Sequence, residues 1–273
     1  MVYEIDGHAP SLLPDGAEWR LVWNDEFDGT ELDRTKWFYR LDMVGKRHKP
    51  YVDDLVHLDG KGNAVFTLEE REDGTYYSST LQTGENYTDR GVDKDTCRTP
   101  TFMHKYGYYE CRCILQDKSP WWSAFWLQSP SIACEDMPPE QAGVEVDIME
   151  SFAPGRVIPH FNHWGGYGEG HKFANSAGFD RWATDEDAID VSLGEYHYFG
   201  VDWQLDGYTF YIDGKQSGNK IEGPVSDTEQ FILLFTECKG HRDQVPGYVA
   251  SDEFGHGIKD RFIVDFVRVF DKV

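Results

Sequence analysis

One stretch of the chain decides the fold: Gly143-Val144-Glu145-Val146-Asp147-Ile148-Met149-Glu150-Ser151-Phe152. Acidic and apolar residues alternate in its first half, and a period of two is typical of a β-strand. Glu145 and Asp147 then share one face, while the apolar residues between them point into the core. Glu150 is an odd number of steps from Asp147, so a regular strand would turn it toward the core. A one-residue β-bulge at Ile148-Met149 returns Glu150 to the acidic face. We therefore expect three carboxylates in one row.

The segments around this strand are also rich in residues that favour strands. We expect further strands at residues 19–23, 64–68, 76–83, 107–115, 123–128, 196–203, 208–212, 231–237 and 262–270. Asp206-Gly207 lies between two aromatic-rich runs and is a strong signal for a tight hairpin. No long amphipathic helix stands out. The pattern predicts an all-β protein built as a sandwich of short strands.

The domain organisation is predicted to be simple. A β-sandwich of 273 residues often forms a single unit. We expect an N-terminal extension at residues 1–18 that packs on one catalytic β-sandwich domain at residues 19–273. Four stretches rich in Gly, Asp or Pro are expected to form long surface loops: residues 86–100, 130–142, 165–190 and 239–260.

The chain is strongly acidic. It has 26 Lys and Arg against 49 Asp and Glu, which gives a net charge of −23. This charge argues against a nucleic-acid partner and an anionic membrane surface, because both require clustered basic side chains. No apolar run approaches the roughly 18 residues of a membrane-spanning helix, so we expect no membrane insertion. A neutral or cationic substrate is compatible with this charge.

Three carboxylates in one row suit retaining glycoside hydrolysis, which needs a nucleophile and an acid/base about 5–5.5 Å apart. Glu145 and Glu150 would fill these two roles. Asp147 would share a hydrogen bond with the nucleophile and help to keep the acid protonated by charge repulsion. The alternative is an exposed acidic strand face, which is common in a protein of this charge. Spacing alone does not separate the two interpretations.

The acidic stretch resembles the E-x-D-x-x-E signature of glycoside hydrolase family 16 in its bulged form. That family includes laminarinases, mixed-linkage β-glucanases, agarases, porphyranases and carrageenases. Further landmarks of the family follow in family order over nearly the whole chain. They are Trp23-Asn24-Asp25-Glu26-Phe27-Asp28-Gly29, Tyr106-Gly107-Tyr108-Tyr109-Glu110-Cys111-Arg112, Trp122-Ser123-Ala124-Phe125-Trp126-Leu127 and Val264-Asp265-Phe266-Val267-Arg268-Val269-Phe270. In the third of these, Ser123 replaces the proline of the family.

The resemblance implies a fold and a set of roles. The fold is a curved, concanavalin A-like β-jelly-roll sandwich with an open substrate cleft on its concave face. The roles are nucleophile for Glu145, its assistant for Asp147 and acid/base for Glu150. Catalysis in this family uses no cofactor.

Aromatic residues on both sides of the acidic strand are candidates for sugar binding, because indole rings stack on the apolar faces of sugars. Trp121, Trp122 and Trp126 precede the strand, and His163 and Trp164 follow it. The run His163-Trp164-Gly165-Gly166 is similar to one in laminarinase-like members of the family. Core packing is the alternative for each of these side chains.

Two departures from the family pattern bear on the substrate. Many laminarinase-like members carry an Asn-rich run that ends in Gly-Gly where this chain has Glu237 and its neighbours. Glu237 could bind a sugar hydroxyl there or pair with a basic residue. The second departure is Lys46-Arg47-His48-Lys49. Arg47 could bind an anionic sugar substituent such as sulfate or uronate, or the run could be a solvated loop tip.

The resemblance also implies a candidate metal ligand. Family members often hold one structural Ca²⁺ on the convex side, and Asp265 matches the Asp of the closing strand that serves as a ligand. Asp265 lies in a row with Ile263 and Val267, and an Asp among apolar residues needs a partner. A salt bridge with an Arg is the alternative.

The sequence therefore predicts a retaining endo-glycosidase that acts on a polysaccharide or oligosaccharide, with β-1,3- or mixed-linkage β-glucan as the leading substrate. An agarase- or porphyranase-like galactan hydrolase, on neutral or sulfated galactan, is the alternative among hydrolases. A transglycosylase would share the same residues. A non-catalytic carbohydrate-binding sandwich is the alternative from another class, and the intact carboxylate triad argues against it.

The sequence says little about assembly and location. We expect a monomer. The first residues, Met1-Val2-Tyr3-Glu4-Ile5-Asp6, have neither the basic nor the apolar region of a signal peptide. We expect an extracellular location if a leader has been trimmed and a cytoplasmic one otherwise.

Overall fold

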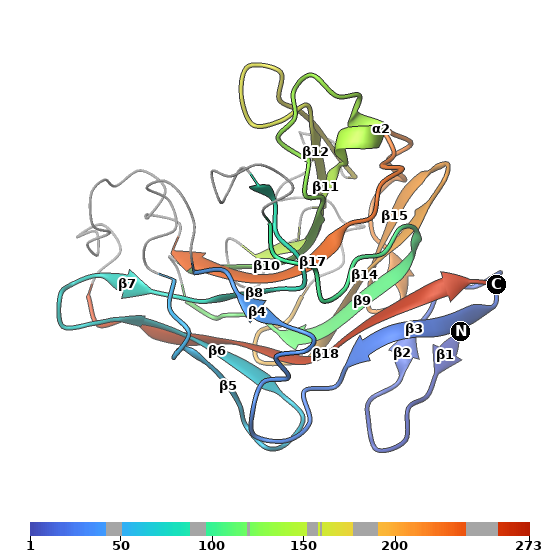
Figure 1. Ribbon diagram of the computed structural model, residues 1–273. Coiled ribbons are helices and arrows are strands. Elements are labelled where there is room, and N and C mark those ends of the chain that lie inside the picture. Colours follow the sequence, from blue (N-terminus) through green and yellow to red (C-terminus); the bar gives the residue numbers. More distant parts are fainter. Residues whose placement is uncertain are drawn as a thin grey trace.

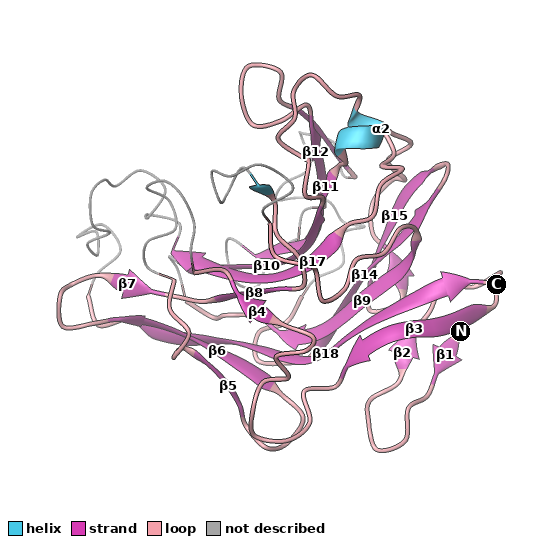
Figure 2. Ribbon diagram, in the orientation of Figure 1, coloured by secondary structure: helices cyan, strands magenta, loops and turns pink. Residues whose placement is uncertain are grey.

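The protein is a sandwich of two antiparallel β-sheets that lie face to face (Figures 1 and 2). The computed structural model describes residues 1–41, 51–87, 97–118, 121–151, 158, 160–176, 191–238 and 256–273. Named strands pair antiparallel throughout these residues. The architecture agrees with the predicted jelly-roll sandwich.

The first sheet has seven strands and carries the acidic stretch. In spatial order they are β13 (Lys172–Asn175), β12 (Phe161–Trp164), β11 (Glu145–Ser151), β10 (Trp121–Gln128), β17 (Phe231–Cys238), β8 (Thr80–Gln82) and β4 (Phe38–Tyr39). The acidic strand β11 thus lies inside the sheet, between β10 and β12.

The second sheet has nine strands. Seven follow one another as β16 (Lys215–Gln216), β15 (Gly207–Ile212), β14 (His197–Gln204), β9 (Gly107–Ile114), β18 (Lys259–Lys272), β6 (Ala64–Glu70) and β5 (Val56–Leu58). Two more join at its sides: β3 (Trp19–Asp25) pairs with β18, and β7 (Tyr76–Tyr77) pairs with β6. A separate pair is formed by β1 (Val2–Tyr3) and β2 (Ser11–Leu12).

The main core lies between the two sheets. Strands of the seven-stranded sheet contribute Phe125, Leu127, Val146, Ile148, Ile232 and Leu234, and strands of the nine-stranded sheet contribute Cys111, Cys113, Val201, Phe210, Val264 and Val267. Each fully buried aliphatic or aromatic side chain contributes about 1.5–3 kcal/mol of hydrophobic free energy, so this layer dominates folding. The opposite face of the seven-stranded sheet, called the outer face below, does not pack in this core.

The closing strand β18 is buried on both sides. One side packs in the main core, while Phe270 packs with Leu13, Trp19 and Tyr108 beneath the N-terminal segment. The first 18 residues therefore supply the second cover for this strand.

A buried ion pair ties the N-terminal segment to the sandwich. The Arg268 guanidinium donates to both oxygens of Glu26, at 2.8 and 2.6 Å, and also to the Ala9 carbonyl and the Ser11 hydroxyl. Glu110 accepts a hydrogen bond from the Leu12 amide at 2.9 Å. Three of the sequence landmarks thus meet in one structural cluster, which explains why they have these residue types.

Two expected features differ in detail. The segment expected as one strand at residues 76–83 forms two strands in different sheets, because the chain crosses from β7 to β8. The expected loops at residues 130–142 and 165–190 contain the helical turn α2 (Pro139–Ala142) and the edge strand β13. Short elements like these are too brief to show a periodic pattern. Arg47 and its basic neighbours lie outside the described residues.

Candidate active site

Strand β11 carries the acidic stretch, and its pairing with β10 contains a bulge. Asp147 lies opposite Trp126, but the next pair along the strands is Met149 with Phe125. Ile148 is therefore the extra residue of β11, which agrees with the bulge that the sequence predicts.

The bulge decides which side chains share the outer face. Ile148 and Met149 both pack in the main core, so the alternation restarts and Glu150 lies on the same face as Asp147 and Glu145. Asp147 and Glu150 are only 4% and 8% exposed. Carboxylates buried to this degree are costly for folding unless they have partners or a function.

The carbonyl of Ile148 has its own partner on the core side. His160 lies there, 1% exposed, with its ring stacked on Phe210 at 4.7 Å. Its Nδ1 donates to the Ile148 carbonyl at 2.6 Å, and its Nε2 accepts from the Ser217 hydroxyl at 2.8 Å. Burial lowers the pKa of His160 to about 4, so the ring is neutral at ordinary pH.

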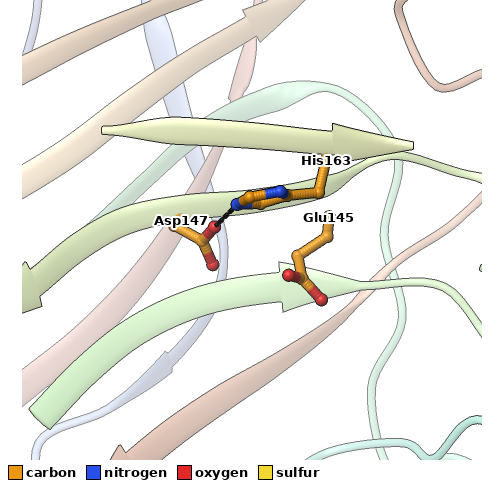
Figure 3. Close-up of side chains that lie close together, drawn as sticks. All are labelled: Glu145, Asp147 and His163. Carbon is orange, nitrogen blue, oxygen red and sulfur yellow. Dashed lines mark ion pairs between the residues drawn. The ribbon is translucent and has the colours of Figure 1, made fainter. Parts of the chain in front are cut away.

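Glu145, Asp147 and His163 lie together on the outer face (Figure 3). His163 comes from β12, where it pairs in register with Glu145. Its Nε2 lies 3.3 Å from Asp147 Oδ2, and its Nδ1 lies 3.0 Å from Nε2 of His171. The three groups have the right types for a cation, but each already has a hydrogen-bond or ion-pair partner. We assign no metal to them.

Glu145 accepts two hydrogen bonds on one oxygen. Gln128 Nε2 donates to Oε2 at 3.0 Å, and the Tyr167 hydroxyl donates to the same atom. Burial and the negative charge of Asp147 raise the pKa of Glu145 to about 6, and His163 and the two donors oppose this rise. The carboxyl therefore changes charge within the range in which enzymes commonly work.

Two of the aromatic candidates lie beside the carboxylates. Trp122 and Trp126 belong to a cluster on the outer face that also contains Tyr51, Ala124 and Phe235. Phe235 makes edge contacts with both indoles, at 4.8 and 6.0 Å. The Arg40 guanidinium lies 5.4 Å from the Trp126 ring. This cluster forms an apolar patch next to the acidic strand.

Two other candidates do not lie on that face. Trp121 is fully buried on the core side, where it contacts Tyr76 and packs with Leu68 and Cys238. Trp164 packs against the main core. The reason is the alternation along a strand: Trp121 precedes Trp122, and Trp164 follows His163, so each pair divides between the two faces.

Glu237 does lie near the aromatic cluster. It pairs in register with Trp122 and is 1% exposed, and the Tyr51 hydroxyl lies 3.5 Å from its Oε2. The Glu237 carboxylate is therefore buried beside aromatic rings at the edge of the acidic face. Arg47, the other departure from the family pattern, is outside the described residues.

The residues around Asp265 do not fit a calcium ion. Asp265 Oδ2 accepts a hydrogen bond from Arg112 Nη1 at 2.5 Å, and that guanidinium also lies 4.0 Å from the Tyr196 ring. Calcium sites are built from several oxygen ligands. The positive guanidinium beside Asp265 would instead repel a cation. The structure therefore favours the alternative interpretation, a salt bridge with an Arg.

Three residues of the site gave no signal in the sequence. Gln128 ends an expected strand, Tyr167 lies in an expected loop, and His160 was one histidine among several. Polar side chains on the expected strand before the acidic one include Gln128, but His160 precedes the unexpected strand β12 and Tyr167 follows it. Among the described residues, no helix is both long and apolar enough to cross a membrane.

Comparison with known proteins bears on this site. A family model described as "Glycosyl hydrolases family 16" matches residues 63–222, which include the acidic strand. "Glucan endo-1,3-beta-glucosidase A1" of Niallia circulans is 25% identical over 215 residues, which cover 73% of this chain and 29% of that protein. "Beta-porphyranase C" of Zobellia galactanivorans is 25% identical over an alignment of 317 positions, which covers 97% of this chain and 83% of that protein. This chain thus spans less than a third of the length of the first relative and most of the second.

A solved structure has the same fold. The catalytic domain of an endo-1,3-beta-glucanase (laminarinase) from Thermotoga petrophila RKU-1 superposes with a TM-score of 0.66 at 23% identity, over 94% of this chain and 99% of that one. At this identity the likeness supports the jelly-roll architecture, and the assignment of chemistry rests on the residues of β11.

Proposed function

The chain belongs to glycosyl hydrolases family 16, and from this premise we propose that it is a retaining endo-glycosidase that cleaves internal β-linkages of a polysaccharide. One observation carries the proposal. A bulge at Ile148 brings Glu145, Asp147 and Glu150 to one face of one strand, and two of these carboxylates are almost fully buried. A protein that only binds sugar has no need of such an arrangement.

The proposed reaction has two steps. In the first, an oxygen of Glu145 attacks the anomeric carbon, the glycosidic C–O bond breaks, and the leaving oxygen takes the proton of Glu150. In the second, Glu150 takes a proton from water as the water oxygen attacks the anomeric carbon and releases Glu145. Two inversions give net retention.

The surroundings of Glu145 support its role as nucleophile. A nucleophilic carboxylate must be ionised, and its pKa of about 6 makes it so at neutral pH. His163 lies 3.3 Å from Asp147, and its interaction with Glu145 favours the ionised carboxylate, in opposition to Asp147. We propose that Asp147 and His163 together set the acidity of the nucleophile.

We propose a neutral β-glucan, with β-1,3- or mixed linkages, as the substrate. Trp126, which is only partly buried, offers apolar surface for a sugar ring beside the carboxylates, and the buried Trp122 and Phe235 belong to the same cluster. The likeness to the Niallia glucan endo-1,3-beta-glucosidase supports this choice. The net charge of −23 also favours an uncharged polymer.

A galactan is the second candidate. The likeness to the Zobellia porphyranase favours it, because that match covers nearly the whole of this chain and most of the relative. The reaction and the roles of the carboxylates would be the same, and only the contacts to the sugar substituents would differ.

A panel of polysaccharides with analysis of product linkage tests the proposal. Laminarin, lichenan, agarose and porphyran cover both candidates. We expect hydrolysis of laminarin or lichenan, and NMR should show the β-anomer as the first product from a β-linked substrate. Initial release of the α-anomer would overturn the two-step reaction. Binding of a glucan without any cleavage would favour the carbohydrate-binding alternative.

The remaining expectations concern partners and metals. We propose that the protein is a monomer and needs no cofactor for hydrolysis. Its negative charge opposes contact with nucleic acid. We do not include a structural Ca²⁺ at Asp265, because Arg112 already pairs with that carboxylate. A chelator should leave the melting temperature unchanged, and a fall that added Ca²⁺ reverses would restore a calcium site.

A further inference from the structure

We propose that Gln128 and Tyr167 are positioning residues that hold Glu145 by its Oε2 and leave Oε1 as the oxygen that attacks the sugar. The inference rests on the proposed function, because it concerns the nucleophile of that reaction. It adds two residues, Gln128 from β10 and Tyr167 from the turn after β12, to the groups that act on Glu145.

The hydrogen bonds on Glu145 are one-sided. Gln128 Nε2 and the Tyr167 hydroxyl both donate to Oε2, and they also lie within hydrogen-bond distance of each other, at 2.5 Å. Within the described part of the chain, Oε1 of Glu145 accepts no hydrogen bond. A carboxylate held through one oxygen has its orientation fixed and keeps the lone pairs of the other oxygen for attack.

The orientation of the Gln128 amide is itself fixed. Asn86 Nδ2 donates to Gln128 Oε1 at 2.6 Å. Because the amide oxygen is engaged by this donor, only the amide nitrogen is left to face Glu145. Asn86 and Gln128 are both almost fully buried, so water does not compete for these contacts.

The turn that carries Tyr167 has a backbone that glycines make possible. Gly165 and Gly166 have φ values of 77° and 73°, in the left-handed region that favours glycine. A Cβ at Gly165 would lie 2.5 Å from the Gly170 carbonyl oxygen, so the chain passes close to itself in this turn. Although Tyr167 is 47% exposed, its position above Glu145 is therefore set by a tight turn.

These two donors also affect the chemistry of both steps. They favour the ionised form of Glu145, in opposition to burial and to Asp147. In the covalent intermediate, Oε2 becomes the carbonyl oxygen of the ester, and it regains negative charge as the sugar leaves. Donors that are already in place stabilise that charge. The charged and titratable groups around Glu145 are Asp147, His163 and Tyr167, with His171 behind His163.

The test uses Tyr167→Phe and Gln128→Met, with matched controls far from the site. Tyr77→Phe removes a tyrosine hydrogen bond to Asp73, and Gln204→Met removes an amide hydrogen bond to Asp202. Two quantities are measured in each variant: kcat and KM on the preferred polysaccharide as a function of pH, and the pKa of Glu145 by ¹³C NMR of labelled Glu carboxyls. The Glu145 signal is assigned by its loss in Glu145→Gln.

We expect each site variant to lower kcat by about tenfold, since one charge-assisted hydrogen bond is lost, with little change in KM. Each should raise the pKa of Glu145 and move the acid limb of the pH–rate profile upward, and the controls should do neither. A residue that only contacts sugar would instead raise KM and leave the Glu145 pKa unchanged.

The proposal is overturned if the NMR pKa of Glu145 and the acid limb stay unchanged in Tyr167→Phe, a variant at an exposed turn that should fold normally. This outcome differs from failure of the proposed function, which would appear as full activity in Glu145→Gln or as no hydrolysis of any polysaccharide. The NMR titration does not depend on turnover, so it decides the positioning role in either case.

Discussion

His160 donates a hydrogen bond from Nδ1 to the carbonyl of Ile148, and Ile148 is the extra residue of the bulge in β11. The bulge moves Glu150 onto the outer face, so a core histidine supports the arrangement of the three carboxylates from behind. Its second nitrogen is fixed by Ser217, and its ring stacks on Phe210.

Replacing His160 with Leu should lower both stability and activity. The Ile148 carbonyl would lose its buried donor, which costs about 1–3 kcal/mol of unfolding free energy, and the bulge would lose its support. His160→Asn, whose side-chain amide can occupy the position of Nδ1, should recover part of both. Phe210→Leu serves as control, because it weakens the core but keeps the hydrogen bond. Equal loss of activity in Phe210→Leu at matched stability would contradict the supporting role.

The stability should depend on pH through His160. Burial lowers its pKa to about 4 from an ordinary value of 6.5. As pH falls, the unfolded state binds a proton before the folded state does. The stability contributed by the neutral ring is therefore fully present above about pH 6.5 and is lost progressively down to about pH 4, by up to roughly 3 kcal/mol. Urea unfolding at pH 7 and pH 4.5 should show a smaller loss in His160→Asn than in the wild type; equal losses would contradict this assignment.

Much of this site could be predicted from the sequence, because strands have a fixed period. The odd spacing between Asp147 and Glu150 required a bulge, and the register shows one at Ile148. The sequence predicts most of the longer strands of the two sheets, but β5, β12, β13 and the two-residue strands are too short to show a pattern.

The rest depended on tertiary contacts. Trp121 and Trp122 are adjacent, and the packing of Trp121 against Leu68 and Tyr76 decides that Trp122 lies on the face of the carboxylates. Tyr167 reaches Glu145 from a turn 22 residues later in the chain, and no periodicity relates the two. The partner of Asp265 lies 153 residues away, so the sequence left calcium and a salt bridge as equal alternatives.

Removing either outer carboxylate should abolish hydrolysis without unfolding the protein. Glu145→Ala and Glu150→Ala should each lower kcat by about 10²–10⁴-fold or more, as expected for loss of a nucleophile or a general acid. Asp147→Asn should cost less. Glu31→Ala, at an exposed position, is the control, and circular dichroism checks the fold. Retention of more than a tenth of the turnover in Glu145→Ala would exclude it as the nucleophile.

The acid limb of the pH–rate profile should lie near pH 6, because Glu145 must be ionised and its pKa is about 6. Asp147→Asn removes a negative neighbour that makes ionisation harder, so the limb should move to lower pH. His163→Gln removes an interaction that favours the anion, so the limb should move to higher pH. Profiles of kcat/KM for the three proteins provide the measurement. Shifts of the same sign in both variants would show that another group controls the limb.

The dependence of kcat/KM on ionic strength distinguishes a neutral substrate from a charged one. The protein carries −23, so it repels a polyanion at long range and would bind one only through a local basic group, for which Arg47 is the sequence candidate. On a neutral β-glucan no formal charge is paired, so kcat/KM should be nearly independent of ionic strength, and Arg47→Ala should change it less than about twofold. On a sulfated galactan each buried contact to sulfate would contribute about 1.5–3 kcal/mol. Arg47→Ala would then lower kcat/KM by about ten- to a hundredfold, and salt would change the rate. We expect the neutral case. If porphyran is turned over faster than laminarin, and this activity is lost in Arg47→Ala, the substrate is the sulfated polymer.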